Sequence, residues 1–133
     1  MRHFLLAAIL VMGVGCAFAQ TIPPIPASAI VPTGVKRQIG FFAWLNADCS
    51  PDGDTRSRLI KQPENGTVEL EDGLGYSQFL PSNQRYECNK HPVMGVQVFY
   101  TSKDGFIGKD SFKSEFFTSS GQDIVWSYSV TVK

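Results

Sequence analysis

The chain contains few of the residues on which catalysis and metal binding most often depend. Its 133 residues include two histidines and three cysteines, and His91 is the one histidine outside the N-terminal segment. A catalytic serine or cysteine needs a base within reach, but His91 precedes Pro92 in a turn-like stretch, and no Gly-x-Ser-x-Gly sequence is present. Cys88 and His91 have a ligand-like spacing, yet a zinc site needs about four ligands. We therefore expect no enzyme activity and no zinc site.

An excess of charge of either sign is also absent. The chain has 12 basic and 12 acidic residues, with histidine counted as neutral. Binding to nucleic acid requires a basic surface for the phosphates, and electrostatic attachment to a membrane requires clustered lysine and arginine. The acidic residues are scattered and single out no carboxylate pair for glycoside cleavage. We therefore expect no nucleic-acid partner.

No apolar run reaches the roughly 20 residues of a membrane-spanning helix. The apolar stretch Phe4–Val14 follows a short basic start and precedes Ala17-Phe18-Ala19, the small-x-small pattern that signal peptidase cleaves. We predict a signal peptide over residues 1–19 with cleavage before Gln20. The mature protein would then lack a transmembrane segment and reside in the periplasm or outside the cell.

A lipoprotein anchored through Cys16 is the alternative. Gly15 fits such a site, whereas Gly13 stands where these sites usually carry leucine. Removal of 19 residues from 133 leaves 114, which is enough for a single domain with one core.

Cysteine is scarce after cleavage, because Cys49 and Cys88 alone remain. Two lone cysteines in an oxidising compartment usually pair. The bond would close a loop of about 40 residues, which the chain-entropy model values at about 4 kcal/mol. We predict the disulfide Cys49–Cys88, with two buried free thiols as the alternative.

Helical periodicity is missing, and eight prolines and twelve glycines argue against long helices. Instead, turn residues separate runs that are rich in β-branched and aromatic side chains. The last run is the clearest, because Ile124, Trp126, Tyr128, Val130 and Val132 alternate with polar residues. About seven strands with frequent turns predict an all-β antiparallel sandwich. The expected strands are 35–45, 55–61, 66–70, 76–80, 93–102, 111–118 and 124–133.

Residues 20–34 carry four of the prolines. Proline fixes φ and lacks the amide donor, so this segment reads as an extended, Pro-rich leader. It serves either as a spacer or as the cover of one sheet edge, and the sandwich domain is expected over residues 35–133. Nine aromatic residues are enough to fill the core of a two-sheet domain, and alternation places one member of each pair Phe41-Phe42 and Phe116-Phe117 outside it.

The order of several short motifs resembles the immunoglobulin-like and cadherin-like repeats of bacterial secreted surface proteins. The motifs are Asp52-Gly53-Asp54, Pro63–Val68, Tyr76, Gly108–Phe112, Gly121 and Val130-Thr131-Val132. Together they span roughly residues 47–132. The resemblance implies an immunoglobulin-like β-sandwich that binds through its surface. This chain departs from the family in having a single copy, a predicted disulfide and an insertion at Ser82–Met94.

Two candidate sites follow from the sequence. The first is the polar 82–94 loop anchored by Cys88, since loops on a rigid scaffold carry recognition; its candidate binding residues are Asn83, Arg85, Tyr86, Lys90 and His91. The second is the turn that carries Asp48, Asp52 and Asp54, where carboxylates could bind calcium. An ordinary solvated Asp-Gly turn is the alternative, and no other cofactor is expected.

We therefore expect an exported, non-catalytic binding or structural module of the periplasm or cell surface. It would recognise a protein or glycan through a sheet face or its end loops. The alternative is a secreted enzyme inhibitor that inserts the 82–94 loop into a cleft.

Overall fold

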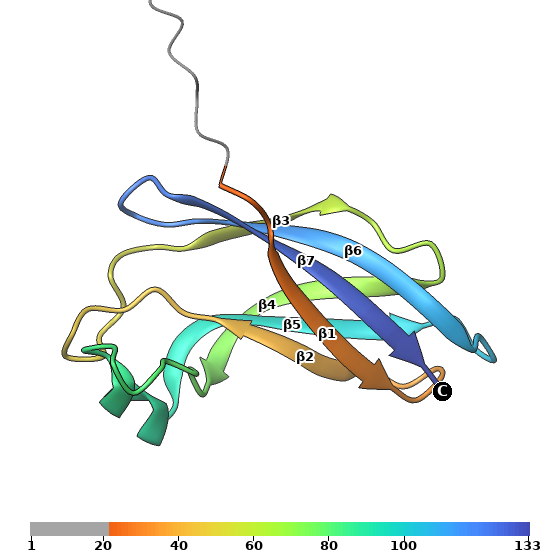
Figure 1. Ribbon diagram of the computed structural model, residues 1–133, viewed down its shortest axis with the longest axis horizontal. Coiled ribbons are helices and arrows are strands. Elements are labelled where there is room, and N and C mark those ends of the chain that lie inside the picture. Colours follow the sequence, from red (N-terminus) through yellow and green to blue (C-terminus); the bar gives the residue numbers. More distant parts are fainter. Residues whose placement is uncertain (1–21) are drawn as a thin grey trace, which may run out of the picture.

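The computed structural model describes residues 22–133, so the predicted signal peptide 1–19, its cleavage before Gln20 and the alternative anchor Cys16 lie outside the described residues. Seven strands and one short 3₁₀ turn form two layers (Figure 1). The elements are β1 (Ile25–Val31), β2 (Arg37–Phe42), β3 (Arg56–Lys61), β4 (Gly66–Gly75), η1 (Tyr86–Lys90), β5 (Val93–Ser102), β6 (Gly108–Phe117) and β7 (Asp123–Val132).

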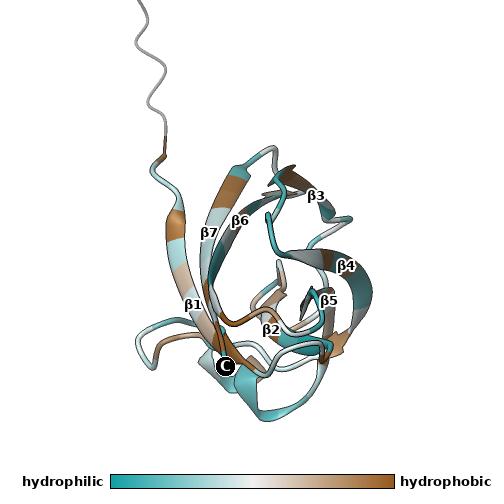
Figure 2. Cartoon of the chain, turned by 90° about the vertical axis from the view of Figure 1, so that its right-hand side faces the viewer, coloured by the Kyte–Doolittle hydropathy of each residue, from teal (hydrophilic) through white to brown (hydrophobic). Residues whose placement is uncertain are grey.

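The two sheets have the strand orders β1-β7-β6-β3 and β2-β5-β4. All pairs are antiparallel except β1 with β7, which are parallel. Viewed from the end, the four-stranded and three-stranded sheets curve around a common interior (Figure 2). The predicted all-β sandwich of about seven strands is therefore confirmed.

The Pro-rich segment contributes an edge strand to the sandwich. Strand β1 lies beside β7 in a register that runs from Ile25 opposite Trp126 to Val31 opposite Val132. Two further backbone bonds, from Thr33 N to Lys133 O and from Lys133 N to Val31 O, continue the pairing. The sequence left a spacer and the cover of a sheet edge as alternatives, and the structure shows that the segment covers the edge of the four-stranded sheet. Proline is tolerated there because one side of an edge strand needs no amide donor.

Two of the expected strands are wrong in detail. Strand β4 does not end at residues 71–73 but continues to Gly75, paired with β5 along its whole length. The run 76–80 forms no strand. Instead, the Asn89 side chain holds it, because Asn89 Oδ1 accepts hydrogen bonds from Ser77 Oγ and Phe79 N, and Asn89 Nδ2 donates to Phe79 O.

The main core lies between the sheets and is aromatic. Phe42 of β2 stacks on Phe116 of β6 with ring centroids 4.5 Å apart, and Phe112 stacks on Tyr128 at the same separation. Phe112 and Phe116 are fully buried. A side chain of this size contributes about 1.5–3 kcal/mol when it is fully buried, so the predicted aromatic core accounts for much of the sheet-to-sheet packing.

A second, smaller core covers the outer face of the three-stranded sheet near the disulfide. It consists of Leu45, Cys88 and Val93, with Phe41, Ala43, Cys49 and Phe79 packed around them. Phe42 points into the main core, so its neighbour Phe41 points the opposite way, as alternation requires. Phe41 lies over Gly75 and Gly95, where a Cβ atom would approach its ring to within 2.5 and 2.6 Å. Strand β4 continues past Gly73 because these glycines leave room for that ring.

Asp110 joins the two turn motifs Pro63–Val68 and Gly108–Phe112. Its carboxylate accepts hydrogen bonds from the backbone N–H groups of Glu64 at 3.1 Å and Asn65 at 3.0 Å, and from Tyr100 Oη at 2.8 Å. Burial opposes the charge of Asp110, but these bonds together with one from Ser111 N outweigh it and hold its pKa below the usual value. The turn before β4 is thus capped by a side chain of β6.

Candidate functional site

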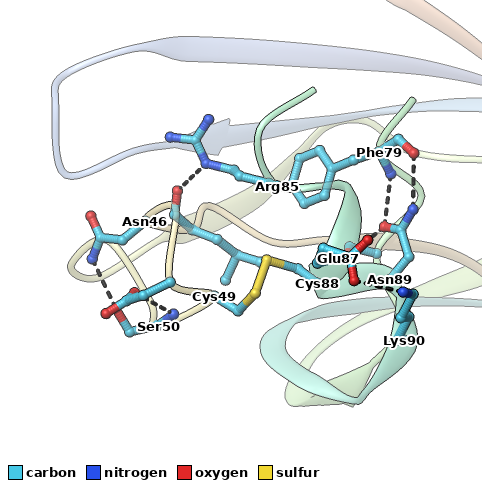
Figure 3. The surroundings of a disulfide bond; sticks show 12 residues. Asn46, Cys49, Ser50, Phe79, Arg85, Glu87, Cys88, Asn89 and Lys90 are labelled. Carbon is cyan, nitrogen blue, oxygen red and sulfur yellow. Dashed lines mark hydrogen bonds and ion pairs between the residues drawn. A yellow bond between two sulfur atoms is a disulfide. The ribbon is translucent and has the colours of Figure 1, made fainter. Parts of the chain in front are cut away.

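The disulfide Cys49–Cys88 forms, as predicted, and connects the β2–β3 connection to η1 (Figure 3). Its two Cα atoms are 5.4 Å apart, and Cys88 is fully buried. Asn89, the residue after Cys88, forms hydrogen bonds with the 77–79 segment. The 82–94 loop is therefore held against the domain.

Three of the five candidate residues in this loop hold the loop itself. Asn83 Oδ1 accepts a hydrogen bond from Arg85 N, and Arg85 Nε donates to the carbonyl of Leu45. Lys90 forms an ion pair with Glu87 at 2.6 Å. Asn83, Tyr86, Lys90 and His91 are all exposed, and Arg85 is half-buried. Binding by these residues stays a prediction.

The acidic turn has the geometry of an ordinary turn. Asp48 Oδ1 accepts hydrogen bonds from the hydroxyl and the backbone N–H of Ser50, and both bonds lower the pKa of Asp48. Within residues 22–133, no three of the histidine, cysteine, aspartate and glutamate side chains gather closely enough to hold a metal ion. Calcium at Asp48, Asp52 and Asp54 stays a prediction.

A long groove lies between the free edges of β1 and β2, which we call the β1–β2 groove. Each of these strands ends its sheet, and in the described part of the chain they are not paired with each other (Figure 1). The groove has two sections of about 750 and 550 Å³. Both sections are lined by Ile39, Gly40, Phe41, Tyr76 and Gln78, so they are continuous.

The inner wall of the groove is aromatic. Its smaller section reaches Trp44, Trp126 and the phenol of Tyr128, and burial raises the pKa of Tyr128 to about 12, so the phenol is neutral. Strand β2 bulges between Gln38 and Gly40. A Cβ on Gly40 would lie 2.6 Å from Tyr128 Oη, so glycine allows β2 to pass close to this phenol.

Large apolar side chains stand exposed on the rim. Ile30 of β1 is 69 % exposed, Leu74 of β4 58 % and Tyr76 60 %. Exposed apolar groups that gather beside a groove mark an interaction surface more often than isolated ones do. The wall and rim therefore combine apolar surface with unpaired strand edges.

The groove is not indicated by the sequence patterns. Ile30 belongs to the Pro-rich leader, and Tyr76 to a strand that does not form. Periodicity shows which side chains of a strand face the core, but it does not show which strand edges stay unpaired. The one available signal is the proline content of β1, which favours an edge position.

Residues 22–133 contain no helix long and apolar enough to cross a bilayer. No family model and no curated protein matches the chain. Among solved structures, the solution structure of amebosin is similar with a TM-score of 0.45 and 11 % sequence identity, over 84 % of this chain and 99 % of that chain. A likeness at this level carries no argument about function.

Proposed function

We propose that this protein is an exported, non-catalytic binding module of the periplasm or cell surface, and that it holds an extended segment of a partner protein in the β1–β2 groove. The observation that carries the proposal is an aromatic groove that lies between two unpaired strand edges. Support for export comes from the predicted signal peptide and from the disulfide, because disulfides persist in oxidising compartments.

An extended peptide fits this arrangement for two reasons. The outer edge of β2 presents unpaired backbone N–H and C=O groups that a further strand can pair with. Alternate side chains of that strand would then enter the aromatic section, which is the usual source of specificity in strand addition. The resemblance to bacterial immunoglobulin-like and cadherin-like repeats agrees with a surface-binding role.

A random peptide library displayed on phage and selected on the mature protein tests the proposal. Selected peptides should lose binding to the variant Ile30→Ser/Leu74→Ser, which removes two rim side chains. The matched control Ile60→Ser/Ile107→Ser removes two exposed isoleucines elsewhere, 45 % and 62 % exposed, and should keep binding. Equal binding to both variants would place the peptide site outside the groove.

A secreted enzyme inhibitor that uses the 82–94 loop is the second candidate. The loop is preorganised by the disulfide and by Arg85, while Tyr86 stays 40 % exposed, and a preorganised loop loses little entropy on binding. Shortening the loop would remove Cys88 and Asn89, so the sharper test is the variant Tyr86→Ala/His91→Ala. Inhibition of a panel of secreted hydrolases should be lost in this variant with the melting temperature unchanged.

A further inference from the structure

The outer face of the four-stranded sheet gathers positive charge. On β6, Phe112, Ser114 and Phe116 are fully buried and face inward, so alternation turns the odd-numbered residues 109–117 to the outside. Extending this assignment across the paired strands gives a basic face of six cationic residues against the two acids Glu115 and Asp123. The cationic residues are Arg56, Arg58, Lys61, Lys109, Lys113 and Lys133.

Most of this charge is unpaired. Arg58 forms an ion pair with Glu115 and lies over the Phe117 ring. The other five cationic residues of the basic face form no ion pair within residues 22–133. A chain with near-zero net charge therefore presents a positive sheet face, while the opposite sheet carries Glu69 and Glu71 around Lys36.

Two lysines on this face oppose each other directly. Lys61 of β3 and Lys113 of β6 are register partners, and Lys61 Nζ reaches Ser111 Oγ at 3.1 Å on the same side of the sheet. Like charges directly opposite each other destabilise a sheet. An anion bound beside these two lysines would offset their like charges.

Rows of short hydroxyl side chains lie between the cations. Ser28, Ser129 and Ser111 are register partners across β1, β7 and β6, and Thr131 lies opposite Lys109 in the next outward row. Two apolar side chains share this face, the exposed Ile30 opposite Thr131 and the Phe117 ring beneath Arg58. They lie near opposite ends of β6 and so do not form the central aromatic cluster on which protein–protein interfaces depend.

We infer that the basic face binds an anionic polysaccharide. The lysines would bind its carboxylate or sulfate groups, and the serine and threonine rows would exchange hydrogen bonds with sugar hydroxyls. Ser28 also lines the β1–β2 groove, but none of the six cationic residues does, so this inference goes beyond the peptide binding proposed above. An anionic lipid surface and single-stranded nucleic acid are the competing polyanions that the test must separate.

The test uses fluorescently labelled polygalacturonate and the mature protein, with binding followed by anisotropy. The variant Lys61→Gln/Lys113→Gln should bind about tenfold more weakly, whereas the control Lys36→Gln/Lys103→Gln, with the same net charge, should change by less than about twofold. Binding by the unaltered protein should weaken as salt rises from about 50 to about 200 mM. The melting temperature of Lys61→Gln/Lys113→Gln should equal or exceed that of the unaltered protein, because a like-charge pair is removed.

Three results would overturn the inference. The first is no measurable binding of polygalacturonate at low salt, and the second is equal weakening by both double variants, which would indicate a general charge effect. The third is tighter binding to oligothymidylate or to vesicles of anionic phospholipid than to polygalacturonate, which would assign the face to another polyanion.

Discussion

At the scale of single residues, Asp110 is the side chain on which most local structure depends. It receives three backbone N–H groups and the Tyr100 hydroxyl at an 8 % exposed position. In Asp110→Asn, the amide group presents donors where the turn also presents donors, so we expect a loss of about 2–4 kcal/mol of unfolding free energy. Urea unfolding at pH 7 measures this loss. As the control, Asp72→Asn changes an exposed carboxylate of β4, and its unfolding free energy should lie within about 0.5 kcal/mol of that of the unaltered protein.

The pH dependence of this effect has a definite sign. The folded-state pKa of Asp110 is lowered, because hydrogen bonds to its carboxylate outweigh the opposing effect of burial. Its contribution to stability is therefore complete above the unfolded pKa of about 3.9 and is lost as the pH falls through the lower folded value. We expect the stability gap between the unaltered protein and Asp110→Asn to be constant from about pH 7 to pH 5 and to shrink below about pH 4. A gap that widens on acidification would contradict this assignment.

At the scale of the elements, β4 can continue to Gly75 because there is space for the Phe41 ring. The three atoms nearest to a Cβ at Gly75 would all belong to the Phe41 ring, the closest of them at 2.5 Å. We expect Gly75→Ala alone to cost about 1–3 kcal/mol and to be nearly neutral in a Phe41→Ala background, because the clashing ring is then absent. Thermal unfolding of the four proteins of this double-mutant cycle measures the coupling. Equal costs in both backgrounds would mean that Phe41 does not restrict this position.

Strands β4 and β5 show which features of an element can be predicted from the sequence and which cannot. Strand β5 matches the predicted run 93–102, because its alternation and its flanking turns are local signals. The end of β4 depends on Phe41, which is distant in the sequence, and the irregular 76–80 segment depends on the Asn89 side chain, which lies 10 residues beyond Phe79. Local patterns carry no information about such partners, and so Tyr76, a main residue of the candidate groove, was placed in a strand.

At the scale of the whole molecule, the architecture and the disulfide could be predicted, whereas the two candidate surfaces could not. The sandwich follows from strand count and alternation, and the disulfide from the pairing of two remaining cysteines. The β1–β2 groove depends on which edges remain unpaired, and the basic face on which strands adjoin β6. The net charge is the sum over both faces, so it does not show that positive and negative residues lie on different faces.

The molecule has two cores with different sources of stability, and the disulfide acts on the smaller one. Cys49 and Cys88 close a separation of 39 residues beside Leu45 and Val93, which the chain-entropy model values at about 4 kcal/mol. The main core between the sheets contains neither cysteine. We therefore expect Cys49→Ala/Cys88→Ala to lower the unfolding free energy by about 3–4 kcal/mol while β-sheet circular dichroism is retained at 25 °C. Hydrogen exchange should rise first in Leu45 and Val93 and remain slow in Val98 and Val130, whereas uniform acceleration across both sets would show that the two cores unfold as one unit.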